Sequence, residues 1–362
     1  MEIRLNFGKT HEAVEIADAN IMGILKPNDV QVERTGAEEV RHALNNPIGT
    51  PRLRDIVKRG EKAVIVTSDI TRPMPSKLVL PAILEEWEAG GADLADITVV
   101  FALGSHRGHT DEEKRYLAGD EVYAKVLCID SNTKDYIDLG STSRGTPVEI
   151  FRPVVTADRI ICLGNIEYHY FAGYSGGAKA IMPGVSTRKA IQSNHSMMVK
   201  EAAHAGAIDH NPVRQDIEEV TNFVKIDFIL NVVLDEKKTI IKAVAGDCRQ
   251  AHREGCLFLD KLYGAKLAET ADIVLVSAGG YPKDINLYQA QKALDNAKHA
   301  VRKGGVIVWA ASCKEGYGEE VFERWMREAE SSASLINRIG VRFELGGHKA
   351  AAIAMVLAKA SV

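Results

Sequence analysis

The 362-residue sequence is poor in cysteine and has no paired cysteine motif. Its five cysteines are scattered, are odd in number and include no C-x-x-C pair. They are Cys128, Cys162, Cys248, Cys256 and Cys313. This pattern argues against both a disulfide scaffold and a zinc ribbon. We therefore expect a chain that works in a reducing cytoplasm.

Long apolar runs and an excess of charge of one sign are also missing. No segment approaches the roughly 18 uninterrupted apolar residues of a membrane helix, and the first residues, MEIRLNFGKT, do not resemble a signal peptide. Lys and Arg number 45 against 49 Asp and Glu, which gives a net charge of −4. Neither nucleic acid nor an anionic membrane is therefore an expected partner.

The composition that remains is that of a globular protein, with 46% hydrophobic and 26% charged residues. From residue 63 the chain repeats a cycle of buried strand, loop and amphipathic helix. Strands are predicted at 63–67, 97–104 and 158–164, and helices at 78–92 and after Thr110. Repeated units of this kind predict a mostly parallel sheet with helices on its faces.

The second half of the chain begins with a different pattern. Residues 226–246 predict an antiparallel hairpin at a sheet edge, around a charged DEKK turn. A strand at 271–280, a helix over 287–305 and a strand at 306–312 then form a second set of βα units. With the length, this predicts two α/β domains, residues 1–267 and 268–362, with the active site in the cleft between them.

Polar side chains cluster directly after the predicted strands, where open parallel sheets bind their ligands. Asp69 and Arg72 follow the first strand in a loop stiffened by prolines. Taken alone, they could bind a carboxylate or phosphate, or simply brace the turn as an ion pair. His106 and His109 follow the next strand, and His169 follows the third. Histidines at the ends of two strands could converge on one pocket and transfer protons on two sides of a substrate.

The stretch from Gly173 to Gly184 is rich in glycine and contains Lys179, a possible nucleophile or anion ligand. Its spacing matches neither G-x-x-x-x-G-K-[ST] nor G-x-G-x-x-G, although its backbone amides could still bind a phosphate. His195 lies beyond it and, taken alone, is typical of a core or surface histidine. Three further polar residues share one face of the predicted helix at 287–305. They are Tyr288, Gln289 and Lys292.

These residues lie in segments that together resemble the nickel-dependent lactate racemase family. The segments are TSDITRPMP, FALGSHRGHT, EYHYFAGYSGGAKAIMPGVS, SNH and LYQAQK, in this order from Thr67 to Lys292. The resemblance implies a nickel-pincer nucleotide, a pyridinium mononucleotide whose two sulfur-bearing arms hold Ni(II), built by accessory proteins. It also implies inversion of the hydroxyl-bearing carbon of a small 2-hydroxy acid by reversible hydride transfer to that cofactor.

The resemblance assigns roles by motif position. His106 and His169 become the two bases, Lys179 the residue tethered to the cofactor and His195 the nickel ligand. The remaining members of the implied site bind the cofactor or the substrate. The cofactor-binding residues are Asp69, Gly173, Ser175, Gly176 and Gly177, and the substrate-binding residues are Arg72, Tyr288, Gln289 and Lys292.

The sequence departs from the family pattern in places. Ala178 stands where a basic residue is expected, and His109 adds an imidazole at the mouth of the pocket, which would suit a substrate larger or more polar than lactate. Family members are also expected to continue beyond Val362. Two other classes of function stay open at this point: a zinc-dependent hydrolase that uses His106, His109 and His169 as ligands, and a protein that only binds an anion or nucleotide.

Overall fold

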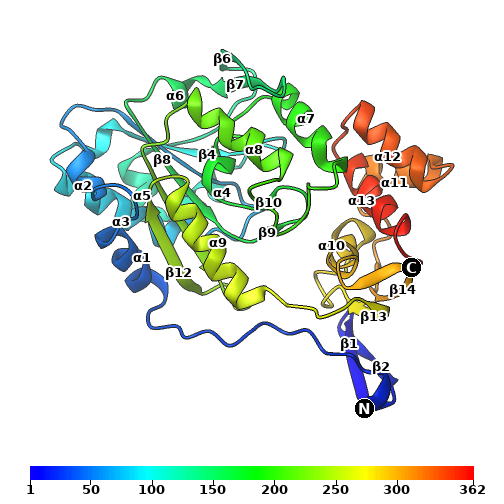
Figure 1. Ribbon diagram of the computed structural model, residues 1–362. Coiled ribbons are helices and arrows are strands. Elements are labelled where there is room, and N and C mark those ends of the chain that lie inside the picture. The colour runs from blue at the N-terminus through cyan, green and yellow to red at the C-terminus, as the bar shows by residue number, and fades with distance from the viewer. The chain divides into compact units, whose positions relative to one another are not determined.

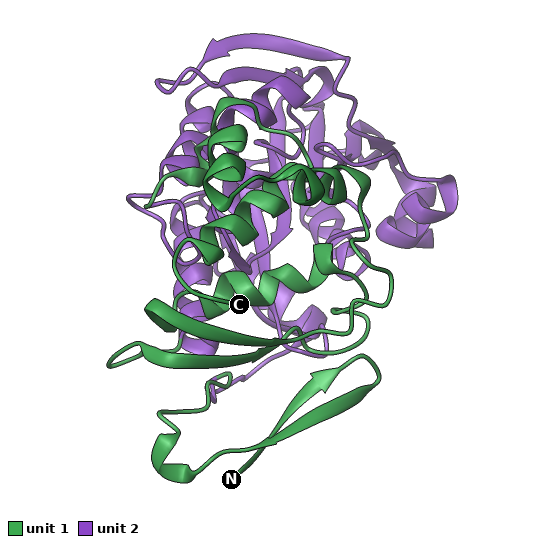
Figure 2. Ribbon diagram, turned by 90° about the vertical axis from the view of Figure 1, so that its right-hand side faces the viewer, with its two compact units in different colours: residues 1–27, 196–201, 265–362 green, residues 28–195, 202–264 purple.

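The computed structural model describes residues 1–362 and divides into two compact units (Figure 1, Figure 2). Unit 2 comprises residues Asn28–His195 and Ala202–Gly264. Unit 1 comprises residues Met1–Pro27, Ser196–Glu201 and Ala265–Val362. The chain passes from unit 2 to unit 1 for the last time between Gly264 and Ala265, close to the predicted division near residue 267. The structure adds that the first 27 residues group with the C-terminal segment.

A six-stranded sheet with the order β12-β11-β8-β3-β4-β5 forms the centre of unit 2. Its strands are β3 (Ala63–Ser68), β4 (Ile97–Ala102), β5 (Leu127–Asp130), β8 (Arg159–Asn165), β11 (Phe228–Leu234) and β12 (Ile240–Gly246). All neighbouring pairs are parallel except β11 and β12, which form an antiparallel hairpin. The mostly parallel sheet and the hairpin at its edge are therefore confirmed.

Helices surround this sheet. They are α1 (Gly36–Asn45), α2 (Leu53–Ile56), α3 (Ser76–Ala89), α4 (Asp111–Ala118), α5 (Asp120–Lys125), α6 (Arg152–Val155), α7 (Arg188–Ser196), α8 (Pro212–Glu219) and α9 (Gln250–Tyr263), with 3-10 turns η2 (Leu94–Asp96), η3 (Gly177–Ala180) and η5 (Val220–Asn222). Two small antiparallel pairs complete the unit: β6 (Tyr136–Ser141) with β7 (Pro147–Phe151), and β9 (Tyr168–His169) with β10 (Gly173–Tyr174).

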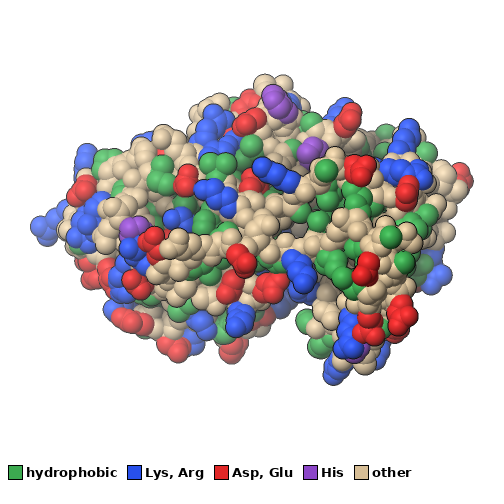
Figure 3. Space-filling model, turned by 60° about the horizontal axis from the view of Figure 1, so that its bottom comes forward, with side chains coloured by type: hydrophobic (Ala, Val, Ile, Leu, Met, Phe, Trp, Pro, Cys, Tyr) green, Lys and Arg blue, Asp and Glu red, His purple; other side chains and the backbone are tan.

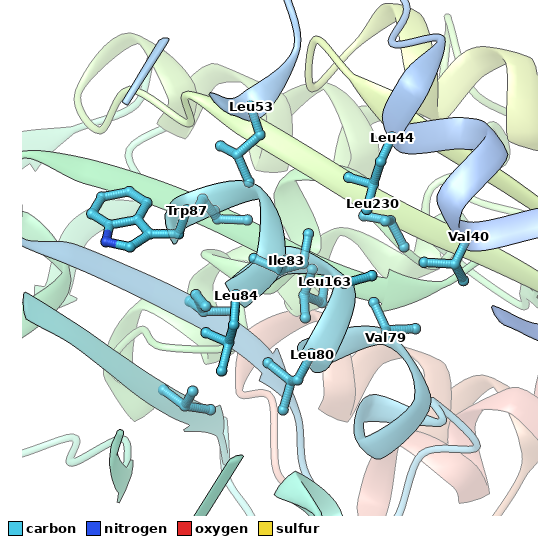
Figure 4. Close-up of a cluster of buried hydrophobic side chains, with 14 of the residues drawn as sticks. Val40, Leu44, Leu53, Val79, Leu80, Ile83, Leu84, Trp87, Leu163 and Leu230 are labelled. Carbon is cyan, nitrogen blue, oxygen red and sulfur yellow. The ribbon is translucent and has the colours of Figure 1, made fainter. Parts of the chain in front are cut away.

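Both faces of the sheet are buried, which explains why its strands read as continuous apolar runs. On one face, side chains of α1 and α3 such as Val40, Ile83 and Trp87 pack against Leu163 and Leu230 of the sheet (Figure 4). On the other face, α9 approaches so closely that a Cβ at Gly255 would lie 3.1 Å from Val244 of β12. Burying such apolar side chains contributes roughly 1.5–3 kcal/mol each.

The local signals of the sequence also hold. Gly90 and Gly91 follow the last residue of α3, as predicted. Thr110 caps α4 in a reciprocal arrangement, because its hydroxyl accepts from the Glu113 amide while the Glu113 carboxylate accepts from the Thr110 amide. These ends fix where the strand-following loops leave the sheet.

Unit 1 is built from two two-stranded sheets and four helices. Its elements are β1 (Glu2–Phe7), β2 (Thr10–Glu15), η1 (Asp18–Asn20), η4 (Met197–Val199), β13 (Ala271–Ser277), α10 (Leu287–Ala297), β14 (Val301–Ala310), α11 (Glu320–Glu328), α12 (Ser332–Val341) and α13 (Gly347–Leu357). The β1–β2 hairpin is bonded to the C-terminal segment, since Ser277 Oγ donates to the Asn6 carbonyl and the Gly8 amide donates to Asp284. This explains why the N-terminal residues belong to the unit.

The predicted helix over 287–305 is too long. In the structure α10 ends at Ala297, and the chain enters β14 at Val301, which pairs with Ala271 of the parallel strand β13. Val301 is β-branched and fully buried, so packing in the sheet outweighs the helical spacing of the apolar residues before it.

The surface agrees with the near-neutral charge balance. On the face drawn in Figure 3, side chains of Lys and Arg are interspersed with those of Asp and Glu. None of the helices combines the length and apolar character needed to cross a membrane. All five cysteines are free thiols.

Candidate active site

The loops that follow β3 and β4 meet at the carboxyl edge of the sheet, where Asp69 and His106 form a close pair. The Nδ1 atom of His106 lies 2.7 Å from Oδ2 of Asp69, and the Thr71 hydroxyl donates to the same carboxylate at 2.9 Å. The Asp69 side chain is only 3% exposed, whereas His106 is 36% exposed. A buried carboxylate therefore holds an accessible imidazole.

The charge state of Asp69 determines which nitrogen of His106 is available. Burial raises the pKa of the Asp69 carboxyl, but the hydrogen bonds from His106 and Thr71 and the charge of Arg72 outweigh burial, so the pKa lies below its usual value. The carboxylate is thus ionised and accepts the Nδ1–H of His106. In the neutral ring the lone pair is then on Nε2, as a general base requires.

Arg72 follows Asp69 but does not form an ion pair with it. The backbone amide of Arg72 donates to the Asp69 carbonyl at 3.2 Å, which forms a tight turn, while its guanidinium makes no salt bridge or hydrogen bond within the chain. The alternative that the two residues merely brace the turn as an ion pair is therefore wrong. An exposed guanidinium of this kind can bind a carboxylate through two parallel hydrogen bonds.

His109 has a structural environment quite different from the pocket mouth expected for it. Its side chain is 1% exposed and its Nδ1 lies 2.6 Å from Oδ1 of Asp130, while its Nε2 accepts from the Ile70 amide at 3.1 Å. Both ring nitrogens are thus used within the chain. The expectation that His109 enlarges the substrate pocket is wrong, and His109 instead supports the loop that carries Asp69.

Aromatic rings connect His169 with His195. Phe171 packs edge-on against both imidazoles, with ring centroids 4.5 Å from His169 and 4.8 Å from His195. Burial is the main cause that holds the pKa of His169 well below its usual value, and the nearby guanidinium groups of Arg72 and Arg214 act in the same direction. His169 is therefore held as a neutral imidazole.

The Ala172 amide donates to Nδ1 of His169 at 3.3 Å. In the neutral ring this weak bond favours the tautomer that carries its proton on Nε2. The two histidines thus differ in their resting state, because His106 carries a lone pair on its outer nitrogen.

Lys179 lies on η3, in surroundings that favour its neutral amine form. No carboxylate pairs with its ammonium, and burial followed by the charges of Arg214 and Arg72 holds its pKa well below the usual value. A neutral amine is the nucleophilic form of lysine, so it can form a covalent bond to an electrophilic group.

Arg214 is a member of this cluster that the sequence analysis missed. It is fully buried on α8, where its guanidinium donates to the carbonyl oxygens of Ala172 and Tyr174. Its position next to Val213 and three residues before Ile217, on the apolar face of an amphipathic helix, is a signal that could have revealed it. A buried arginine without a carboxylate partner places a fixed positive charge beneath the Gly173 loop.

The orientation of His195 is set by the residue before it. Asn194 is fully buried, and its amide nitrogen donates to Oδ2 of Asp216 at 2.7 Å and to the Val213 carbonyl. The Asn194 oxygen must therefore accept, and it lies 2.9 Å from Nδ1 of His195. This places the His195 proton on Nδ1 and the lone pair on Nε2, the arrangement found in histidines that bind metals.

The glycines of the loop are required by protein packing. A Cβ at Gly173 would lie 1.9 Å from the Ala207 carbonyl oxygen, and one at Gly176 would lie 2.7 Å from the Asn231 side chain. Both have positive φ, and the Gly177 amide donates to Asn231 at 2.8 Å. Ser175 likewise bonds to the Asn165 carbonyl and the Glu167 amide. The glycines were expected to let the backbone approach a ligand closely. In the structure the neighbours that this backbone approaches are protein residues, Ala207 and Asn231.

The three residues predicted on the second α/β unit lie at the start of α10, as their spacing indicated. Lys292 Nζ donates to Oε1 of Gln289 at 3.1 Å, and the Tyr288 ring packs edge-on against Phe322. These contacts lie within unit 1, whereas the other candidate residues lie in unit 2.

Comparison with known proteins identifies the family of the chain. Residues 7–206 match the model of the lactate racemase N-terminal domain, and residues 267–344 match that of the lactate racemase C-terminal domain. The chain belongs to the lactate racemase family. It is thus a member of a family of isomerases, as the motifs predicted.

Two curated lactate racemases are similar over most of the chain. The protein from Thermoanaerobacterium thermosaccharolyticum is 37% identical over 344 residues, which are 93% of this chain and 80% of that relative. The protein from Lactiplantibacillus plantarum is 32% identical over 343 residues, again 93% of this chain and 80% of the relative.

The solved structure of the lactate racemase apoprotein from T. thermosaccharolyticum superposes with a TM-score of 0.89 at 34% identity and covers 99% of this chain and 87% of that one. A Thermotoga maritima protein shares the fold at 20% identity, with a TM-score of 0.63 over 88% of this chain and 82% of that one. The α/β fold class is confirmed by the first match.

The zinc hydrolase alternative finds no support in the lactate racemase fold. No three His, Cys, Asp or Glu side chains are grouped so that they could hold a metal ion, and His109 already uses both ring nitrogens. A pincer nucleotide needs only one ligand from the protein, because its own atoms supply the others. The Nε2 lone pair of His195 and the neutral Lys179 amine are what such a group requires, so the residues present fit it.

Proposed function

We propose that the protein racemises a 2-hydroxy acid with a nickel-pincer nucleotide attached to Lys179 and ligated by His195. The observation that carries this proposal is the environment of these two residues: a lysine without a carboxylate partner, whose pKa is lowered by burial, and a histidine whose Nδ1 is bound by the Asn194 side-chain oxygen, which leaves the lone pair on Nε2. When bound, the group supplies a reversible acceptor for hydride from the substrate carbon. Side chains of the protein bind the substrate and transfer its hydroxyl proton.

Arg72 binds the substrate carboxylate through its unpaired guanidinium and so fixes the hydroxyl-bearing carbon in the site. His106 takes the hydroxyl proton at Nε2, while ionised Asp69 stabilises the imidazolium that forms. His169 serves the hydroxyl of the opposite enantiomer. For this its proton must move to Nδ1, and its 3.3 Å bond with the Ala172 amide is weak enough to be given up. We further propose that Tyr288, Gln289 and Lys292 complete the substrate site from the second domain.

The proposal is tested with protein produced in a host that also makes the cofactor-building accessory proteins. We expect such protein to contain nickel and a mass adduct on the peptide with Lys179, and to convert pure L-lactate or D-lactate to the racemate, followed by chiral chromatography. Protein that carries the adduct and nickel but leaves every 2-hydroxy acid unchanged would refute the assigned reaction. An unmodified Lys179 in active protein would refute the assigned attachment.

A prediction about His109 tests the support of the Asp69 loop. Replacing His109 with leucine removes the partner of the half-buried Asp130 and of the Ile70 amide, which is expected to cost about 1–3 kcal/mol of stability. The loop then shifts, and a displacement of about 1 Å near the reacting atoms can lower kcat about 100-fold. His109→Gln, which can both donate and accept, should retain more of both properties.

Urea unfolding and kcat measured on equally loaded proteins check this prediction. If His109→Leu kept wild-type kcat and stability, His109 would have no positioning role. A loss of nickel instead of kcat would show that it supports the cofactor and not the base.

A further inference from the structure

A small cavity opens beside His106 at the carboxyl ends of β4 and β5. Its volume is about 160 Å³. Its lining residues are Leu103, Gly104, His106, Ser131, Asn132, Thr133 and Arg188. Apart from Leu103, these side chains are polar or absent. The cavity therefore offers little to an apolar group such as the methyl of lactate.

The charge of the cavity comes from Arg188, the first residue of α7. Its guanidinium makes no salt bridge or hydrogen bond within the chain. No carboxylate is among the lining residues, and the carboxylates that flank them have other partners, because Asp69 binds His106, Asp130 binds His109 and Asp135 binds Arg152. Arg188 therefore gives the lining a positive charge without an ion-pair partner.

Hydrogen-bond donors complete the lining. Ser131 is 6% exposed, and its Oγ accepts from the Leu103 amide at 3.0 Å, so its hydroxyl proton remains available to a ligand. The side-chain oxygen of Asn132 accepts from the Lys134 amide, which leaves the amide nitrogen of Asn132 as a donor. A guanidinium with hydroxyl and amide donors is a set suited to a carboxylate.

We propose that this cavity binds a second carboxylate on the substrate, so that the preferred substrate is a 2-hydroxy diacid such as malate. The inference rests on the proposed function, because it takes His106 as the base next to the hydroxyl-bearing carbon. Arg72 binds the carboxylate attached to that carbon, and Arg188 binds the one at the end of its side chain. A monoacid leaves Arg188 without a partner.

The test compares malate with lactate as substrates of the cofactor-loaded protein and its variants. The variants are Arg188→Gln, Arg188→Lys and the control Arg59→Gln, which alters an exposed, unpaired arginine before β3, at the opposite edge of the sheet. Wild-type protein should have a higher kcat/KM for malate than for lactate. Arg188→Gln should lower kcat/KM for malate about 10- to 100-fold, mainly through KM, and change that for lactate less than about threefold.

Arg188→Lys, which keeps the charge but not the planar fork, should lie between wild type and Arg188→Gln, and Arg59→Gln should match wild type. An equal loss for both substrates would overturn the inference. So would a fall in nickel and in the Lys179 adduct, since the cavity would then hold the nucleotide phosphate. Racemisation of lactate, together with a kcat/KM for malate that does not depend on Arg188, would refute the second carboxylate site and leave the proposed function standing. Loaded protein inactive on both acids would likewise refute the second carboxylate site, and only inactivity on every 2-hydroxy acid would refute the proposed function.

Discussion

Lys179→Ala is expected to yield folded protein with neither nickel nor activity. Alanine removes the amine whose pKa the structure lowers at this position, and with it the proposed point of attachment. Racemisation should fall below detection, and mass spectrometry should find no adduct on the corresponding peptide. Lys179→Arg should behave in the same way, because a guanidinium stays protonated and is not a nucleophile.

Two observations keep this prediction specific. The control Lys58→Ala alters an exposed lysine before β3, at the opposite edge of the sheet, and should keep full loading and activity. Circular dichroism should show that each variant is folded. Nickel bound in stoichiometric amount by folded Lys179→Ala would contradict attachment through this residue.

His106→Gln and His169→Gln are each expected to slow racemisation about 100- to 10,000-fold, the range of a lost general base. Two enantiomers are equally stable, so the loss in kcat/KM must be the same from L-substrate as from D-substrate. Asp69→Asn should also be severely impaired, because an amide at this position can donate to Nδ1 of His106 and so favour the tautomer with its proton on Nε2.

Initial rates with each pure enantiomer measure these effects on proteins of equal nickel content. His11→Gln, an exposed histidine of β2, is the matched control and should keep wild-type rates. Near-wild-type rates for either active-site variant would remove that histidine from the reaction. A difference between its two directions would indicate unequal loading or a contaminating enzyme.

The sequence predicted the architecture of the sheet well because its strands are buried on both faces. Continuous apolar runs such as AVIVT and RIICLG are typical of strands at the centre of a parallel sheet. The loops that follow such strands lie at the carboxyl edge of the sheet, where ligands bind. This rule alone pointed to Asp69, His106 and His169. The roles of Lys179 and His195 came from the family resemblance, since an isolated lysine or histidine has no distinguishing pattern.

Other features could not be predicted, because they depend on contacts between residues far apart in the sequence or on strands too short for the periodicity of apolar residues to reveal. Asp69 and His106 are 37 positions apart, and nothing in either segment says that the carboxylate orients the imidazole. The same holds for His109, whose partner Asp130 follows another strand. The β1–β2 hairpin was missed although EIRLNF alternates apolar and polar residues before a two-residue turn, because its strands are short and mostly exposed.

Arg214 bears on the order in which the mature protein is assembled. Backbone carbonyl oxygens alone hold its guanidinium, so its charge is in place as soon as the chain has folded and does not wait for a small molecule. Together with burial, which is the larger cause, this charge lowers the pKa of Lys179 in the folded chain before any nucleotide is bound. Maturation can then be a late event in the life of the protein, in which a finished scaffold captures a nucleotide delivered to it.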